Sequence, residues 1–150
     1  MDSGYMEAVR YVVQQRLLEL FARVRKRFFP EWDLNCKWEI VAGQRKRSKG
    51  ETGYCSSKEK RIYIHPNGVK DMPDDGLLAL IIHEICHDVA TAHHTERWIE
   101  RMERAARRAE SLEQPKLALK IRASAYCEIP VGKPWREKWC KYLYHLIYPG

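Results

Sequence analysis

Apolar residues recur every three or four positions along the N-terminal part of the chain, and arginine and glutamine occupy the positions between them. The recurring residues are Val9, Val13, Leu17, Leu20, Phe21, Val24 and Phe28. This spacing places them on one face of a helix, and Pro30 follows the last of them. The pattern therefore predicts an amphipathic N-terminal helix that packs one face into a core.

The pattern then changes to the alternation typical of β-strands. In residues 35–43, NCKWEIVAG, apolar residues alternate with Lys37 and Glu39. Two further short runs, TGYCSS at 52–57 and RIYIHP at 61–66, are joined by the charged turn KEK. Strands that follow one another through short turns pair antiparallel. The sequence therefore predicts a three-stranded antiparallel meander.

Helical spacing returns after residues 72–75, MPDD, where Asp74 is the expected N-cap of a helix beginning near Asp75. The run GLLALIIHEICHDVATA follows at 76–92. Thr95 is the expected N-cap of a second helix, which extends to about residue 112. Pro115 either breaks the chain or opens a third helix through residue 126, and an aromatic helix over 135–148 closes the sequence.

These elements predict an α+β fold with an N-terminal helix, the strand meander, a central histidine-bearing helix and several C-terminal helices. A chain of 150 residues with 45% hydrophobic content suits one core. No linker or internal repeat divides it, so we expect a single domain over residues 1–150. Residues 115–150 would form a helical C-terminal extension of that domain.

The net charge and the cysteine content bear on the partners of the protein and on its cellular compartment. The net charge of +7 favours an anionic partner such as nucleic acid, although a solvated basic surface is the alternative. The five cysteines are odd in number and form no Cys-x-x-Cys pair, which favours free thiols in a reducing compartment. No apolar run is long enough for a membrane span. We therefore expect a cytoplasmic protein that has no membrane partner.

The central helix carries the pattern His-Glu-x-x-His at His83, Glu84 and His87. Residues four positions apart lie one turn apart on the same helix face, so two imidazoles can converge on one metal ion. The Glu84 carboxylate is long enough to reach a water molecule on that ion. Two ligands and a general base on one turn are what a zinc peptidase requires. The alternative is two histidines that flank an apolar core stripe.

A catalytic zinc ion needs a third protein ligand, and His93 and His94 are the candidates. We favour His94 because it directly precedes the apolar arc of the next helix, which starts at Trp98. His93 would give the shorter metzincin spacing, but Ala90 stands where those proteins have glycine. A carboxylate from the next helix is a further alternative, namely Glu96 or Glu100.

The segment HEICH at 83–87, followed by HTERWIERM at 94–102, resembles the SprT-like zinc metallopeptidases. The segment GYCSSKEKRIYIHP at 53–66 is similar to the strand pair that precedes the active-site helix in this family. The resemblance spans about residues 38–109. Thr95 stands where the family usually has glycine after the third histidine.

The resemblance implies a minimal zincin-like fold and a zinc metalloendopeptidase. His83, His87 and His94 would bind Zn²⁺, and Glu84 would be the general base toward a zinc-activated water that hydrolyses peptide bonds. Members of the family include proteases that act on DNA-bound proteins. The resemblance therefore implies a protein or peptide substrate, including proteins associated with DNA.

Basic segments indicate a second class of function. The loop QRKRSK at 44–49 holds four cations that could contact nucleic acid, namely Arg45, Lys46, Arg47 and Lys49. Another cluster, formed by Arg23, Arg25, Lys26 and Arg27, is alternatively explained by cations that favour a helix C-terminus. The alternative to a peptidase is thus a nucleic-acid-binding module whose zinc site is structural or vestigial.

Overall fold

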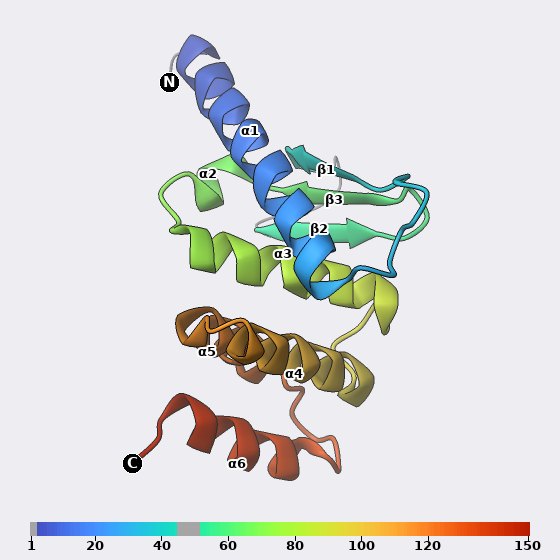
Figure 1. Cartoon of the computed structure of the whole chain (residues 1–150), viewed down its shortest axis with the longest axis vertical. Helices are drawn as coiled ribbons and strands as arrows, with labels where there is room; N and C mark the ends of the chain where they lie inside the picture. Colours follow the sequence, from blue (N-terminus) through green and yellow to red (C-terminus); the bar gives the residue numbers. More distant parts are fainter. Residues whose placement is uncertain (1–2, 45–51) are drawn as a thin grey trace. The chain divides into compact units, whose positions relative to one another are not determined.

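A computed structural model describes residues 3–44 and 52–150, and the chain forms two compact units, residues 1–78 and 79–150. The boundary falls inside the helix α3 (Asp74–Val89). The elements are an N-terminal helix, a small three-stranded sheet and a series of helices (Figure 1), which confirms the α+β class. The expectation of a single domain stays a prediction.

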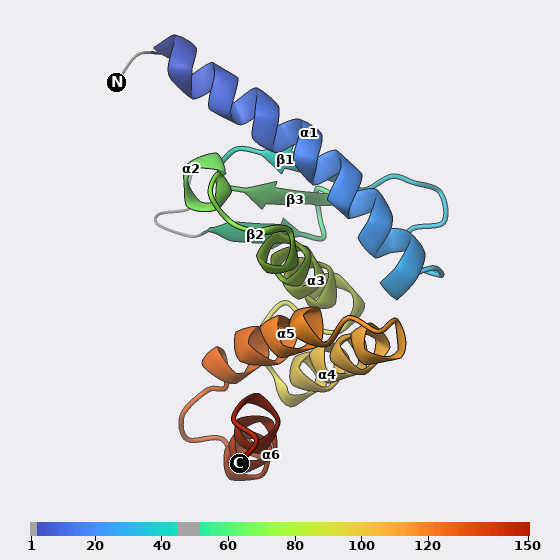
Figure 2. The same cartoon turned by 60° about the vertical axis from the view of Figure 1, so that its left-hand side comes forward.

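The N-terminal unit is built on helix α1 (Ser3–Phe28) and the sheet. The predicted apolar face is buried, apart from the half-buried Val9, and includes Leu17 and Val24 with no exposed surface. Figure 2 shows α1 lying along the sheet, where it contacts strand β1 (Glu39–Ala42). The helical spacing of the sequence therefore identified both the helix and the face it buries.

The sheet is mixed, so the prediction of an antiparallel meander is wrong. Strand β3 (Arg61–Ile64) lies in the centre, parallel to β1 and antiparallel to β2 (Gly53–Ser56). Only β2 and β3 form the expected hairpin. The central position of β3 agrees with the complete burial of Ile62 and Ile64. Alternation of side chains identifies strands but does not determine their partners, and the error came from assuming that neighbours in sequence pair.

Gln14 of α1 closes part of the backbone edge of β1. Its side-chain amide donates to the carbonyl oxygen of Ile40 at 2.9 Å, and its side-chain oxygen accepts from the backbone N–H of Ala42 at 2.6 Å. The two bonds repeat the donor and acceptor pattern of a neighbouring strand. One glutamine therefore satisfies backbone groups of an edge strand from the side of a helix.

Two details differ from expectation where the sheet leads into α3. A short helix, α2 (Pro66–Val69), follows β3, and His65 caps it by accepting from the backbone N–H of Asn67 at 3.2 Å. Helix α3 begins at Asp74 itself, one residue before the expected start. Asp74 is therefore a helical residue, and its carboxylate pairs with Arg16 at 2.7 Å.

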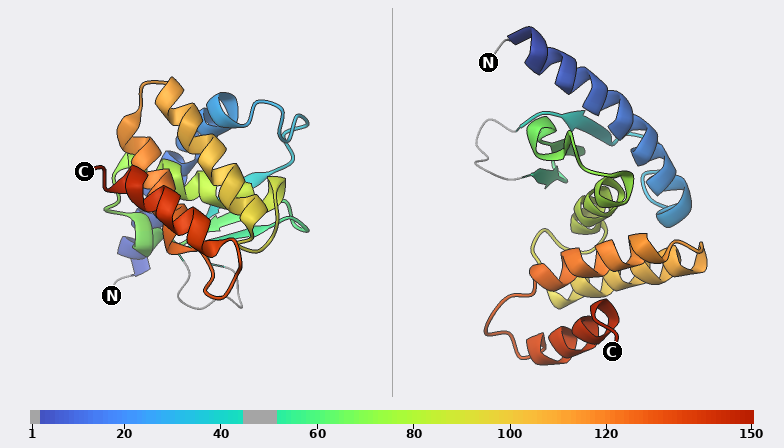
Figure 3. Two further views of the ribbon diagram at one scale, coloured as in Figure 1. Left: turned by 90° about the horizontal axis from the view of Figure 1, so that it is seen from below. Right: turned by 90° about the vertical axis from the view of Figure 1, so that its left-hand side faces the viewer.

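The C-terminal unit holds the rest of α3 and three further helices, α4 (Glu96–Ser111), α5 (Pro115–Cys127) and α6 (Arg136–Ile147). Thr95 caps α4 as predicted, and Pro115 opens α5 rather than breaking the chain. Figure 3 shows α4 and α5 side by side in opposite directions, with α6 next to them. Small buried residues on α4, such as Ala105 and Ala106, allow this close packing.

A buried ion pair joins α4 to α5. Arg122 donates from Nε and one terminal nitrogen to the two carboxylate oxygens of Glu103, at 3.0 and 2.9 Å, and also to Glu110 at 2.8 Å. The Tyr142 hydroxyl of α6 donates to the same Glu103 carboxylate at 2.8 Å. Although burial opposes the charge, these carboxylates raise the pKa of Arg122 above its usual value. Three helices are therefore connected through one buried carboxylate.

Candidate metal centre

Three histidine rings meet in the C-terminal unit. His83 and His87 lie one turn apart on α3, and His94 lies in the loop before α4. Their ring centroids are 5.1 Å apart for His83 and His87, 5.2 Å for His83 and His94, and 4.7 Å for His87 and His94. One ligand atom from each lies within 4.8 Å of the others, and the three residues form a group able to hold a metal ion.

The distance between two of these rings fits a tetrahedral metal site. The Nε2 atoms of His83 and His94 are 3.3 Å apart. Two imidazole nitrogens that bind one tetrahedral zinc ion at about 2.0–2.1 Å are about 3.3–3.4 Å from each other. The donor set also consists of neutral nitrogen ligands, which zinc accepts readily. The residues present therefore fit a metal ion.

Each imidazole has a partner at Nδ1, while the Nε2 atoms of His83 and His94 face each other. Nδ1 of His87 donates to the carbonyl oxygen of Thr91 at 3.1 Å. Nδ1 of His83 lies 2.9 Å from the Ser124 hydroxyl, and Nδ1 of His94 lies 3.3 Å from Oε2 of Glu128. A carbonyl and a carboxylate can only accept, so they favour a proton on Nδ1. The Nε2 lone pair is then free to bind a metal ion.

Trp98 of α4 packs against all three rings. Its indole is fully buried, is stacked on His87 with ring centroids 5.3 Å apart, and meets His83 and His94 edge-on at 4.7 and 4.6 Å. Its Nε1 also donates to the backbone carbonyl of His83 at 3.3 Å. Because the ring touches every histidine of the group, Trp98 restricts how far each imidazole can rotate.

Hydroxyl groups hold the loop that carries His94. The Thr91 hydroxyl donates to the carbonyl oxygen of His93 at 2.7 Å and lies 2.7 Å from the Thr95 hydroxyl. The Thr95 hydroxyl in turn accepts from the backbone N–H of Trp98 at 3.4 Å. Thr95 therefore links the helix cap to the loop, a connection that a glycine at this position could not make.

Burial keeps the three imidazoles in the form that binds metals. It lowers the pKa of His83 to about 3, and repulsion from His87 and His94 acts in the same direction. Burial is also the main reason why the pKa values of His87 and His94 are lowered. Neutral imidazole is the ligand form of histidine, so these rings need not lose a proton before they bind a metal ion at neutral pH.

Glu84 lies beside this cluster. Its side chain is buried, and Oε2 is 4.0 Å from Nε2 of His83, the nitrogen that faces His94. A carboxylate at this place can accept a proton from a water molecule held near the three nitrogens. Cys86 is also buried on α3, and burial raises the pKa of its thiol to about 12. The thiol is therefore not a reactive nucleophile at neutral pH.

The other candidate ligands lie elsewhere. His93 is exposed and is not part of the cluster. Glu96 accepts from Nε1 of Trp139 at 2.8 Å, so its carboxylate is held toward α6, and Glu100 is exposed. The arrangement supports His94 as third ligand, and that assignment stays a prediction.

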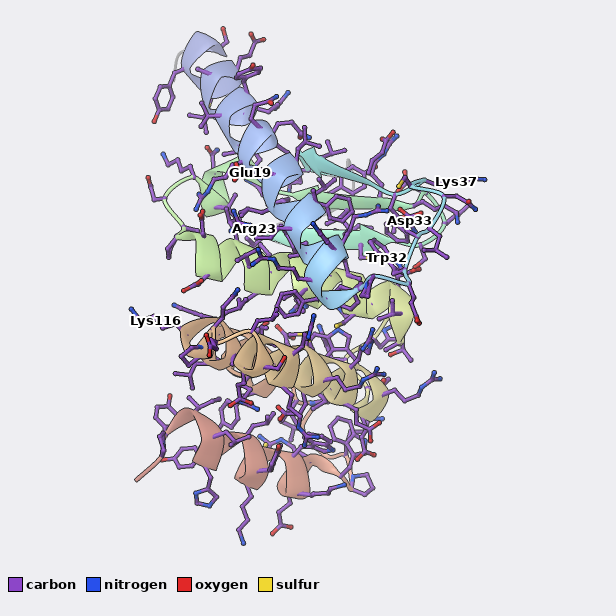
Figure 4. The ribbon with its side chains drawn as sticks, viewed as in Figure 1. Glu19, Arg23, Trp32, Asp33, Lys37 and Lys116 are labelled. Carbon is purple, nitrogen blue, oxygen red and sulfur yellow. The ribbon has the colours of Figure 1, made fainter. Side chains whose placement is uncertain are left out.

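The basic segments are only partly described. The predicted nucleic-acid loop, with Arg45, Lys46, Arg47 and Lys49, lies outside the described residues. In the other cluster, Arg23 pairs with Glu19 at 3.3 Å and Arg25 pairs with Asp33 at 2.6 Å. Figure 4 shows Glu19 and Arg23 on α1, and Asp33 in the segment that follows this helix. Internal ion pairs therefore offset part of the charge of this cluster.

Sequence reasoning did not identify the residues that contact Nδ1 of the histidines. Ser124 is separated from His83 by 41 positions, and Glu128 follows the end of α5. No spacing rule connects these positions to the histidine motif. Their spacing of four residues puts them on the same side of α5. This spacing indicates a role at the histidines only once α5 is known to lie beside them.

Comparison with known proteins gives one match. The model of the SprT-like family matches residues 17–119, which is more than half of the chain and includes the three histidines and Glu84. No curated protein and no solved structure matches the chain. None of the described helices combines the length and apolar composition needed to cross a membrane.

Proposed function

The chain belongs to the SprT-like family, and on that premise we propose that it is a zinc-dependent metallopeptidase. One observation carries the proposal: three imidazoles converge with their Nδ1 atoms occupied, and a buried carboxylate lies beside them. A structural site needs ligands but has no use for a general base. Glu84 therefore favours hydrolysis over a purely structural role.

In this proposal His83, His87 and His94 hold the zinc ion. A zinc ion held by these residues would supply polarisation of a substrate carbonyl and a more nucleophilic water at neutral pH. Glu84 accepts the proton of the attacking water on its carboxylate and delivers it to the nitrogen of the leaving amine. Trp98 and the contacts at Nδ1 keep the imidazoles in place during these proton transfers.

We further propose that the substrates are proteins or peptides, including proteins associated with DNA. This part of the proposal rests on the net charge of +7 and on the basic sequence segment at residues 44–49. The five free cysteines favour a reducing, cytoplasmic setting for the activity.

The test of the activity is the variant Glu84→Gln, with Glu100→Gln on the exposed surface of α4 as matched control. The purified proteins are loaded with zinc and incubated with a fluorescently labelled unfolded protein, with and without DNA. We expect Glu84→Gln to lose at least about 100-fold in cleavage rate because the general base is gone. It should keep its zinc, since the three ligands remain.

Glu100→Gln should cleave at the wild-type rate. Wild-type cleavage by Glu84→Gln would remove Glu84 from the mechanism. If zinc-loaded wild-type protein cleaves nothing but binds DNA with an affinity that falls as salt rises, the second candidate holds, a nucleic-acid-binding module with a structural or vestigial zinc site. The net charge of +7 is the observation that favours this candidate.

A further inference from the structure

The end of helix α5 approaches the histidine cluster from outside the segment that matches the family. Ser124 and Glu128 are four residues apart, at the last turn of α5 and its C-cap. Residues with this spacing lie on the same side of a helix. Both positions follow residue 119, where the family match ends.

These two side chains reach two histidines that come from different segments. The Ser124 hydroxyl is 2.9 Å from Nδ1 of His83 on α3, and Oε2 of Glu128 is 3.3 Å from Nδ1 of His94 in the loop before α4. Both contacts are on Nδ1, whereas the Nε2 atoms of His83 and His94 face each other at 3.3 Å. Glu128 therefore lies behind its histidine and not among the ligands.

Helix α5 is held firmly enough to place these groups. Arg122, two positions before Ser124, makes the two-pronged contact with Glu103 of α4, and both side chains are buried. Leu117 and Ala118 on the same helix are also buried. A fixed helix restricts Ser124 and Glu128 to a narrow range of positions. A group that orients a metal ligand must itself be held in place in this way.

We propose that Ser124 and Glu128 are positioning residues for the metal centre, acting through His83 and His94 and making α5 part of the site. The inference rests on the proposed binding of zinc by these histidines. A carboxylate next to Nδ1 keeps the proton there and increases the basicity of Nε2. A hydroxyl oxygen that accepts from Nδ1 fixes the orientation of the ring in the same way.

The test measures zinc affinity by competition with a chromophoric chelator. The variants are Ser124→Ala, Glu128→Ala and Glu128→Gln, and the matched controls are Ser111→Ala at the end of α4 and Glu137→Gln on the exposed surface of α6. We expect each alanine variant to bind zinc about 10- to 100-fold more weakly than wild type. Glu128→Gln, which keeps an acceptor oxygen without the charge, should lose less than Glu128→Ala. The controls should match wild type.

Two further measurements separate positioning from general stability. Cobalt replaces zinc in the same proteins, and the visible spectrum of the ion should shift in Ser124→Ala and Glu128→Ala but not in the controls. Thermal unfolding of the metal-free variants shows whether the fold is retained. Zinc affinities and cobalt spectra equal to wild type in folded variants would overturn the inference while leaving the proposed function intact. Failure of wild-type protein to bind zinc would overturn both.

Discussion

The Nε2 atoms of His83 and His94 lie 3.3 Å apart although the residues are separated by 11 positions and by the end of a helix. The loop between them is held by the Thr91 and Thr95 hydroxyls, which are 2.7 Å apart. The spacing between helix and loop thus depends on contacts that no part of the His-Glu-x-x-His motif encodes.

This arrangement predicts different results for two adjacent histidines. His94→Ala should reduce bound zinc from about one ion per chain to a small fraction, because a site with two imidazoles binds far more weakly. His93→Ala should keep full zinc content, because His93 is exposed and outside the cluster. Metal analysis after dialysis against a weak chelator checks both. Loss of zinc in His93→Ala with retention in His94→Ala would reverse the assignment of the third ligand.

The metal-free protein should lose stability as the pH falls. Because burial lowers the pKa of His83 from 6.5 to about 3, the unfolded chain binds more protons than the folded one between these pH values. The contribution of neutral His83 to the free energy of unfolding is fully present above about pH 6.5. It decreases toward pH 3, by an amount on the order of 4 kcal/mol.

Urea unfolding at pH 7.5, 5.5 and 4 measures this dependence of the free energy of unfolding. Carboxylates also titrate in this range, so His83→Gln is the comparison. The difference in free energy of unfolding between wild type and His83→Gln isolates the effect of His83. As the pH falls, wild type should lose stability relative to the variant. A difference that is constant across the three pH values would contradict the prediction.

The ion pair between Glu103 and Arg122 should be costly to break on one side only. Arg122→Leu leaves the Glu103 carboxylate buried without its main partner, and we expect a loss of about 3–5 kcal/mol in the free energy of unfolding. The double variant Glu103→Leu and Arg122→Leu should recover most of this loss because no buried charge remains. Urea unfolding of the three proteins checks the prediction, which fails if the double variant is as unstable as Arg122→Leu.

Gln14→Ala should destabilise the sheet more than the neighbouring Gln15→Ala. The first removes two hydrogen bonds to the backbone of β1 and should cost about 1–3 kcal/mol. The second changes an exposed side chain on α1 and should cost less than about 0.5 kcal/mol. Unfolding in urea gives both values, and hydrogen exchange of the Ala42 amide should become faster only in Gln14→Ala.

Local rules account for what could be predicted from the sequence. The apolar face of α1, the Thr95 cap and the i, i+4 spacing of His83 and His87 each depend on residues within a few positions. The parallel pairing of β1 with β3 depends on which strands meet after the chain has folded, and alternation carries no information on that choice. The roles of Ser124 and Glu128 could not be predicted from the sequence for the same reason, because their contacts join segments that are distant in the chain.

The contact of each imidazole through Nδ1 has a consequence for how the centre acquires an ion. Thr91, Ser124 and Glu128 orient the rings by means of the folded chain alone. The conformational entropy of aligning them is therefore lost during folding and not at the moment of association. Uptake of a cation should consequently be fast, with a rate governed by diffusion into the site and by shedding of hydration water rather than by slow rearrangement of the protein.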